Sequence, residues 1–132
     1  MDYFNLHAEK DQLLGVSTLG LAHIGDAVFE LMVRSWLVLH GKATNRGLHR
    51  ATVGYVAAPA QAAMAEKILP VLTEEEADIF RRGRNTSPHS VPKAASRSQY
   101  QTATAVEALF GWLWMKGNKD RLNELFGLMM GE

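Results

Sequence analysis

Two acidic residues of the sequence, Asp26 and Glu107, have no cation near them along the chain. Residues 11–33 contain no lysine or arginine, and Glu107 is the only charged residue between positions 98 and 115. Neither carboxylate therefore has a cation three or four residues away, the spacing at which ion pairs form on a helix. Both lie in apolar stretches, so we expect both to be buried. A buried, unpaired carboxylate is costly unless it binds a cation, meets a distant partner or stays protonated.

The two carboxylates could bind one metal ion if the helices that carry them pack together. Carboxylate oxygens are hard ligands, and Mg²⁺ is commonly held by one or two of them. The alternative is structural, because each acid could cap a neighbouring helix or pair with a distant arginine. The residue pattern by itself leaves both interpretations open.

Two further polar residues lie one helical turn from Asp26. Glu30 precedes Arg34 by four residues, so an ion pair between them is favoured over metal binding, although Glu30 could reach the site through water. His23 precedes Asp26 by three residues, and we expect it to be packed or hydrogen-bonded rather than catalytic.

Basic residues are sorted along the chain although the net charge is zero, with 14 cations and 14 acids. Two segments, 31–65 and 79–106, contain no acid and carry nine of the cations: Arg34, Lys42, Arg46, Arg50, Arg81, Arg82, Arg84, Lys93 and Arg97. Such groups around a polar loop bind phosphates well, which favours a nucleic-acid partner. The alternative, that arginines 81, 82 and 84 complement the negative end of a helix dipole, leaves Lys93 and Arg97 unexplained.

The elements that must position these residues are helices. The sequence has four prolines, no Asn-Gly or Asp-Gly hairpin signal and few stretches of period two, which predicts an all-α fold. Caps and breakers predict helices over 5–14, 18–40, 46–56, 59–69, 74–83, 99–116 and 119–130, with a polar loop over 85–97. The predicted N-terminal caps are Ser17 or Thr18, Thr44 or Asn45, Thr73, Ser98 and Asn118.

Two of these helices, 18–40 and 99–116, are apolar almost all the way round. Helices of this kind are usually buried at the centre of a bundle or in a subunit interface. The length of 132 residues predicts one domain over 1–132. Two such helices exceed what one core of this size can bury, so we also expect a dimer.

The composition excludes several classes of protein. The hydrophobic fraction is 47% and the charged fraction 21%, which is typical of a soluble globular protein and not of a disordered one. The absence of cysteine excludes a disulfide scaffold, a thiolate metal site and a cysteine nucleophile. No run approaches the ~18 apolar residues of a membrane span, and the N-terminus lacks the order of a signal peptide. We expect a cytoplasmic protein with no membrane partner.

Three segments carry a resemblance to a known family. LAHIGDAVFE (21–30) resembles the signature helix of the ribonuclease III catalytic domain, and TAVEALFGWLW (104–114) resembles its later carboxylate helix. RRGRN (81–85), followed by Pro92, Lys93 and a Ser/Tyr/Gln/Thr-rich stretch, resembles the Mini-ribonuclease III branch. That branch is a catalytic domain without a double-stranded-RNA-binding domain. The three segments occur in the family's order and spacing.

The resemblance implies an all-α, homodimeric domain of about seven helices. It implies a Mg²⁺-dependent endoribonuclease that cuts double-stranded RNA to 5′-phosphate and 3′-hydroxyl ends, with Asp26 and Glu107 as the catalytic and metal-binding residues. The implied substrate is precursor large-subunit (23S-type) ribosomal RNA. With no accessory RNA-binding domain, the RNA would be held by the basic loop and its flanks: Arg81, Arg82, Arg84, Asn85, Lys93 and Arg97.

The sequence departs from full-length ribonuclease III at two positions. That family has an acid one turn before each central carboxylate, where this chain has Ala22 and Thr104. The reduced set resembles the Mini branch, and Thr104 joins Glu30 and His23 as residues expected to act, if at all, behind the metal ligands.

Two other functions compete with this interpretation. A non-catalytic RNA-binding or ribosome-assembly protein on the same fold would be expected to lack a central carboxylate. An all-α metal-dependent nucleotide hydrolase would be expected to carry paired acids on one helix, and only Glu30 accompanies Asp26. Since Asp26 and Glu107 are both present, the endoribonuclease is favoured.

Overall fold

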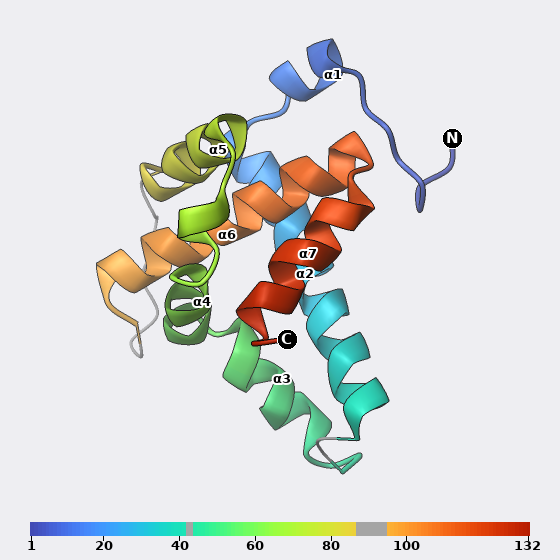
Figure 1. Ribbon diagram of the computed structural model, residues 1–132, viewed down its shortest axis with the longest axis vertical. Coiled ribbons are helices and arrows are strands. Elements are labelled where there is room, and N and C mark those ends of the chain that lie inside the picture. Colours follow the sequence, from blue (N-terminus) through green and yellow to red (C-terminus); the bar gives the residue numbers. More distant parts are fainter. Residues whose placement is uncertain (42–43, 87–94) are drawn as a thin grey trace.

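The computed structural model describes residues 1–41, 44–86 and 95–132 (Figure 1). These residues form seven α-helices and one 3₁₀ turn, and they contain no strand, which confirms the all-α prediction. The elements are α1 (Lys10–Leu14), α2 (Thr18–His40), α3 (Leu48–Val56), α4 (Ala58–Ala65), η1 (Leu69–Val71), α5 (Glu74–Arg84), α6 (Arg97–Lys116) and α7 (Lys119–Met129). Within the described ranges, no helix is both long and apolar enough to cross a membrane.

The predicted caps at Ser17, Thr73 and Asn118 are confirmed. The Ser17 hydroxyl accepts a hydrogen bond from the Gly20 N–H (2.9 Å), and the helix that begins there ends at Gly41, whose φ is 60°. Thr73 and Glu76 form a reciprocal capping box at the start of α5. The Asn118 side chain accepts from the Arg121 N–H at 3.2 Å. Each cap satisfies a backbone donor that the first helical turn leaves free.

In the N-terminal half of the chain, the predicted first residues of two helices are wrong. The first helix begins at Lys10 and not near residue 5, because Glu9 forms a capping box with Gln12. The third begins at Leu48, not near residue 46. Thr44 accepts from the Gly47 N–H at 3.1 Å and thereby closes a turn ahead of the helix.

Other predicted boundaries also shift. Helix α4 ends at Ala65, where the N–H groups of Lys67 and Ile68 bond to carbonyls three residues back, and the chain then forms η1. Helix α5 continues through Gly83 to Arg84, and Asn85 is its C-cap. Helix α6 is capped by Ser96 and not by Ser98, because Ser96 and Gln99 already form a capping box. Of the loop predicted over 85–97, residues 87–94 lie outside the described residues.

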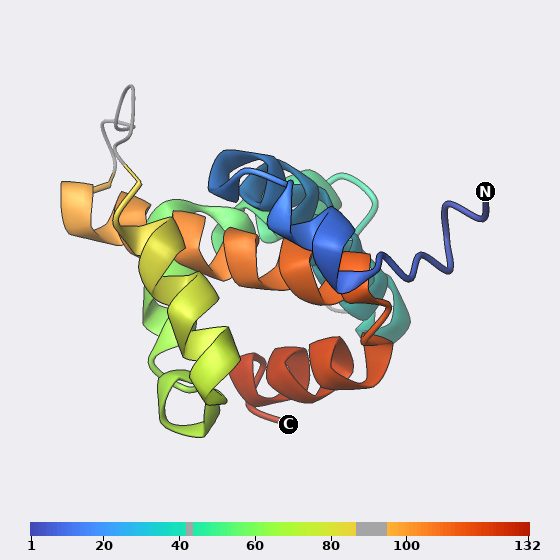
Figure 2. The ribbon, with the colours of Figure 1, turned by 90° about the horizontal axis from the view of Figure 1, so that it is seen from above.

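Helix α6 is the centre of the fold, in contact with α1, α2, α4, α5 and α7 (Figure 2). Almost every side chain from Ala103 to Leu113 is buried, as the sequence predicts. Phe110 of α6 meets Phe29 of α2 edge to face, with ring centroids 5.4 Å apart. Phe126 of α7 contacts the same ring of Phe29 at 5.9 Å. These aromatic contacts join the first and last thirds of the chain.

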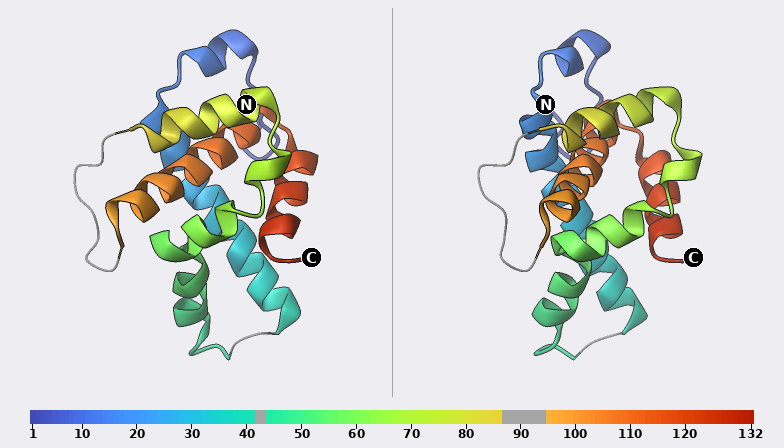
Figure 3. Two further views of the ribbon diagram at one scale, coloured as in Figure 1. Left: turned by 60° about the vertical axis from the view of Figure 1, so that its left-hand side comes forward. Right: turned by 90° about the vertical axis from the view of Figure 1, so that its left-hand side faces the viewer.

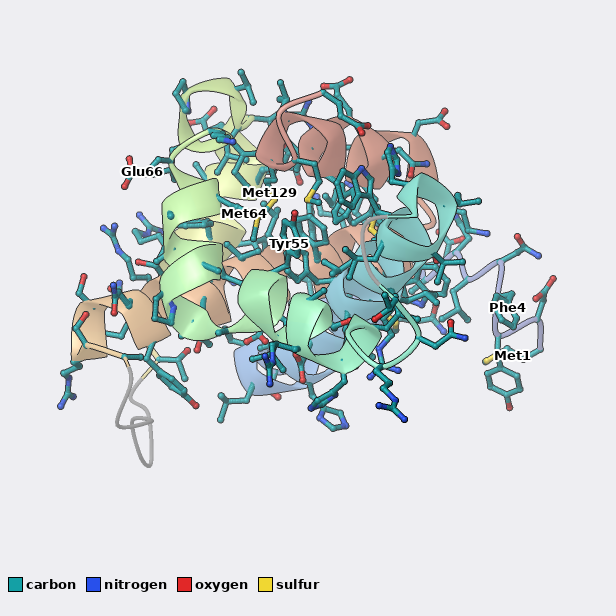
Figure 4. The ribbon with its side chains drawn as sticks, turned by 90° about the horizontal axis from the view of Figure 1, so that it is seen from below. Met1, Phe4, Tyr55, Met64, Glu66 and Met129 are labelled. Atoms are coloured by element: carbon teal, nitrogen blue, oxygen red, sulfur yellow. The ribbon has the colours of Figure 1, made fainter. Side chains whose placement is uncertain are left out.

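The outer helices close the remaining sides of the core. Met64 of α4 and Met129 of α7 are both buried in it, and Tyr55 of α3 is packed against the core (Figure 4). On the other side, Arg121 of α7 binds Glu76 of α5 with two hydrogen bonds of 2.8 Å. The ribbons of these two helices can be followed in Figure 3. Burial would raise the pKa of Glu76, but hydrogen bonds from Arg121 and from Thr73 hold it below its ordinary value.

Helix α2 is buried on one side only within a single chain. One side packs on α6 and α3, but Leu19, Leu31 and Val38 are 51%, 53% and 64% exposed. His23, Asp26, Ala27 and Arg34 are exposed on the same side. The helical period places these residues in one stripe, which we call the α2 stripe: Leu19, His23, Asp26, Ala27, Glu30, Leu31, Arg34 and Val38.

Helices α2 and α6 cross with their backbones in contact. A Cβ atom added to Gly25 would lie 1.6 Å from the carbonyl oxygen of Glu107, and one added to Gly111 would lie 1.9 Å from that of Leu21. No side chain fits at either position, so two glycines, one on each helix, permit the crossing.

Candidate active site

The crossing of α2 and α6 brings Asp26 and Glu107 together. Asp26 directly follows Gly25, and the backbone of Gly25 lies against that of Glu107. The two carboxyl groups are hydrogen-bonded to each other. The structure thus joins two acids that are 81 positions apart in the sequence (107 − 26).

The two carboxyl groups differ in their exposure to solvent. Glu107 is mostly buried between helices, whereas Asp26 is exposed on the α2 stripe. The expectation that Asp26 is buried is therefore wrong, because the apolar residues around it divide between the core side and the exposed side of α2. The pair thus joins one mostly buried carboxyl group to one that faces solvent.

The pKa of Glu107 is raised to about 8. Burial is the main cause, followed by the hydrogen bond and the negative charge of Asp26, while the amide of Gln61 acts in the opposite direction. Near neutral pH the Glu107 carboxyl is thus protonated and donates to Asp26. A cation between the two groups would replace that proton.

Gln61 of α4 is a residue of this site that sequence reasoning missed. Its side chain is only 1% exposed, and its Nε2 donates to the carbonyl of Val56 at 2.8 Å. Its Oε1 is buried and has no hydrogen-bond partner within the described part of the chain. A signal was present, because Gln61 is the only residue of 57–65 whose side chain can form strong hydrogen bonds.

Of the other polar residues predicted near the site, Glu30 forms the expected ion pair with Arg34 at 2.7 Å. His23 is exposed and, as far as the described residues show, is neither packed nor hydrogen-bonded, so that expectation is wrong. Thr104 is buried, and its hydroxyl donates to the Tyr100 carbonyl at 3.0 Å. Its own helix therefore takes up the hydroxyl hydrogen.

The predicted basic residues lie where α5 ends and α6 begins, at one side of the molecule (Figures 1 and 2). Arg81 and Arg82 both bind Asp78 of their own helix. Arg84 and Arg97 are exposed and have no ion-pair partner in the described ranges. Asn85 caps α5. Lys93 lies outside the described residues.

A cavity of about 460 Å³ lies elsewhere, between α1, α5 and α6. Arg82, Trp112 and Lys116 are among its lining residues. Neither carboxylate lines it, so it is distinct from the candidate active site.

The donor set at the carboxylate pair fits Mg²⁺. In the described part of the chain, no group of three His, Cys, Asp or Glu side chains could hold a metal ion. Mg²⁺ does not require such a group, because it keeps several waters and commonly binds one or two carboxylates together with substrate phosphates. The raised pKa of Glu107 marks a place where a positive charge would be favourable.

Comparison with known proteins identifies the family. The Ribonuclease III domain model matches residues 19–118, which include both carboxylates. Mini-ribonuclease 3 of Symbiobacterium thermophilum is 43% identical over 112 residues, covering 85% of this chain and 86% of that protein. Mini-ribonuclease 3 of Thermoanaerobacter sp. is 42% identical over 119 residues, covering 90% and 84%.

A solved structure has the same fold. The crystal structure of a protein from Fusobacterium nucleatum matches with a TM-score of 0.80 at 27% identity, covering 88% of this chain and 94% of that one. The resemblance carried by the three sequence segments is thereby confirmed. The chain belongs to the ribonuclease III family, and it is an endoribonuclease.

Proposed function

We propose that this endoribonuclease cleaves double-stranded RNA in a Mg²⁺-dependent reaction that leaves 5′-phosphate and 3′-hydroxyl ends. The observation that carries the proposal is the hydrogen-bonded pair of Asp26 and Glu107 at the crossing of α2 and α6. Family membership supplies the reaction class.

Asp26 and Glu107 are the residues that would hold the metal. Mg²⁺, when bound, lowers the pKa of a coordinated water and stabilises negative charge on the scissile phosphate. Asp26 faces solvent, where an RNA backbone can approach, and Glu107 lies behind it. Glu107 gives up its proton when the site is loaded, so metal binding releases a proton.

The residues proposed to bind RNA are the cations at the ends of α5 and α6. Arg84 and Arg97 are exposed and free of ion pairs within the described residues, so their guanidinium groups are available to phosphate oxygens. Lys93 belongs to the same basic segment of the sequence. Arg81, Arg82 and Asn85 complete the proposed surface, with the two arginines partly neutralised by Asp78.

We further propose that residues 1–132 form one domain that acts as a homodimer. The α2 stripe places Leu19, Ala27 and Leu31 on one exposed side of the helix. Pairing of this side with a second copy would bury that apolar surface in a two-fold interface. One site per subunit would then cut one strand each, and precursor large-subunit ribosomal RNA in the cytoplasm is the proposed substrate.

The direct test is incubation of the purified protein with a long RNA duplex, with Mg²⁺ or with EDTA, followed by analysis of the product ends. We expect short duplex products with 5′-phosphates and 3′-hydroxyls in Mg²⁺ alone. Equal cleavage in EDTA, or 3′-phosphate ends, would contradict the proposed chemistry.

A further inference from the structure

Gln61 has hydrogen-bonding capacity that its structural role does not use. Its amide has two N–H donors and one carbonyl acceptor. One N–H goes to the carbonyl of Val56, the last residue of α3, at 2.8 Å. That bond ties the amide to the corner between α3 and α4 and satisfies a carbonyl that the end of α3 leaves free. The second N–H and the carbonyl oxygen remain.

The Gln61 side chain also reaches the active site. Helix α4 packs on α6, and the Gln61 amide hydrogen-bonds the Glu107 side chain. Because Val56 holds the amide from one side, Glu107 receives its hydrogen bond from a fixed donor. A carboxyl group held in this way cannot rotate freely about its last bond.

The carbonyl oxygen of Gln61 is a second unusual feature of this residue. Oε1 is buried, and no described residue donates to it. A buried acceptor without a partner carries a free-energy cost on folding, and an unsatisfied group in a native structure calls for an explanation. Methionine has a similar length and would avoid this cost in an otherwise apolar helix segment.

We propose that Gln61 is a positioning residue of the active site, whose amide N–H orients the Glu107 carboxylate for binding of the divalent cation. This inference rests on the proposed function, because it takes Glu107 as a metal ligand. Partners that orient a metal ligand from behind typically change metal affinity or activity 10–100-fold when they are removed.

The test compares Gln61→Met with a matched control, Thr52→Val. Thr52 is also buried, and its hydroxyl donates to the carbonyl of Leu48 at 2.8 Å. Both variants therefore delete a buried donor to a helix carbonyl, but only Gln61 contacts Glu107. Mn²⁺ affinity is measured without RNA by electron paramagnetic resonance of free Mn²⁺. The values of kcat and KM for a duplex are then measured over a range of Mg²⁺ concentrations.

For Gln61→Met we expect Mn²⁺ affinity to weaken roughly 10–100-fold, with kcat at low Mg²⁺ falling in parallel and partly recovering at high Mg²⁺. The KM for RNA should stay within about twofold of wild type, since the RNA surface is unchanged. For Thr52→Val we expect a lower Tm with wild-type Mn²⁺ affinity. Gln61→Asn, which moves the amide one methylene back, gives the same comparison if the methionine variant does not fold.

Two failures can be told apart. If Gln61→Met keeps wild-type Mn²⁺ affinity and a wild-type Mg²⁺ dependence of kcat, Gln61 has only a structural role and the inference is wrong. If the wild-type protein itself neither binds Mn²⁺ at this site nor cleaves the duplex, the proposed function is wrong.

Discussion

At the scale of single residues, Asp26 and Glu107 differ in their exposure to solvent, and this difference sets their protonation. Glu107 lies among helices and shares a proton with Asp26, while Asp26 faces solvent. The absence of helical cations around both residues was enough to select them from the sequence. Sequence pattern could not assign their burial, because the side of a nearly apolar helix that faces the core depends on its neighbours.

The first prediction concerns catalysis by this pair. Asp26→Asn and Glu107→Gln each remove a charged oxygen donor without changing side-chain volume, so each should lower cleavage by at least about 100-fold. The fold should be retained. Rates on a duplex at saturating Mg²⁺, with circular dichroism as the check on folding, measure this. A near wild-type rate for either variant would show that the substituted residue is not catalytic.

The second prediction concerns pH and the metal-free protein. Folding raises the pKa of Glu107 from 4.5 to about 8, so between these values the folded state binds a proton that the unfolded state lacks. The free energy of unfolding should therefore fall as pH rises through this window. Glu107→Gln should abolish this fall, so that its advantage over wild type grows from pH 5 to pH 8.5.

Urea unfolding in EDTA at several pH values measures this effect. Glu76 supplies an internal contrast, because its pKa is lowered. Its contribution is present at neutral pH and is lost only in acid, as pH falls through its folded-state pKa. A wild-type stability that is flat from pH 5 to pH 8.5 would contradict the assignment of a protonated Glu107.

At the scale of elements, caps were more informative than helix interiors. Ser17, Thr73 and Asn118 start helices as predicted, because a side-chain acceptor next to free N–H groups is a local effect. The sequence pattern predicts that this helix ends at Gly83, but α5 continues to Arg84. A Cβ at Gly83 would lie 2.7 Å from the Cα of Ala105, so this glycine serves contact between helices. Such a contact is not visible in a local pattern.

The third prediction compares two helical glycines. Gly25→Ala would place a methyl group 1.6 Å from the Glu107 carbonyl oxygen, so α2 and α6 must separate. We expect destabilisation of more than about 3 kcal/mol and loss of cleavage. Gly54→Ala in α3 meets no atom within 4 Å, and should stabilise by roughly 0.5–1 kcal/mol. Thermal unfolding of both variants tests the pair. Equal effects at the two positions would contradict the backbone contact.

At the scale of the whole molecule, the exposed apolar residues of α2 bear on assembly. The sequence indicates more apolar helix surface than one small core can bury, and Leu19, Leu31 and Val38 are among the apolar residues that the core leaves exposed. Length and composition alone could not show which side this would be, since that follows from how α6 and α3 cover α2.

The fourth prediction is that the protein is a dimer at micromolar concentration and that Leu31→Glu converts it to a monomer. A charge in an apolar two-fold interface is desolvated twice, once in each copy. Val71→Glu is the control, because Val71 of η1 is 45% exposed and Leu31 is 53% exposed. Light scattering measures the mass. A monomeric wild type across this range would exclude the dimer.

The fifth prediction separates RNA binding from chemistry. Replacing Arg84, Lys93 and Arg97 with alanine should weaken binding to all duplex sequences alike. Each lost phosphate contact should flatten the slope of log affinity against log salt by roughly 0.7–0.9. Saturating RNA at low salt should restore most of the cleavage rate, because both carboxylates are intact. An unchanged slope in this triple variant would mean that these three residues do not contact RNA phosphates. The cations of segment 34–50 would then be the candidates.

The contact between Gly25 and Gly111 has a consequence for how this enzyme can be altered. Where helices are held apart by side chains, a change of core volume moves the helix axes and everything attached to them. Here the main chains of α2 and α6 touch directly. The distance between Asp26 and Glu107 should therefore not depend on the volume of the core side chains around them. Repacking of Phe29, Leu109 or Met129 should change the heat resistance of the protein and leave its metal preference as it is. Substitutions in the core should therefore change thermostability without changing the geometry of the carboxylate pair.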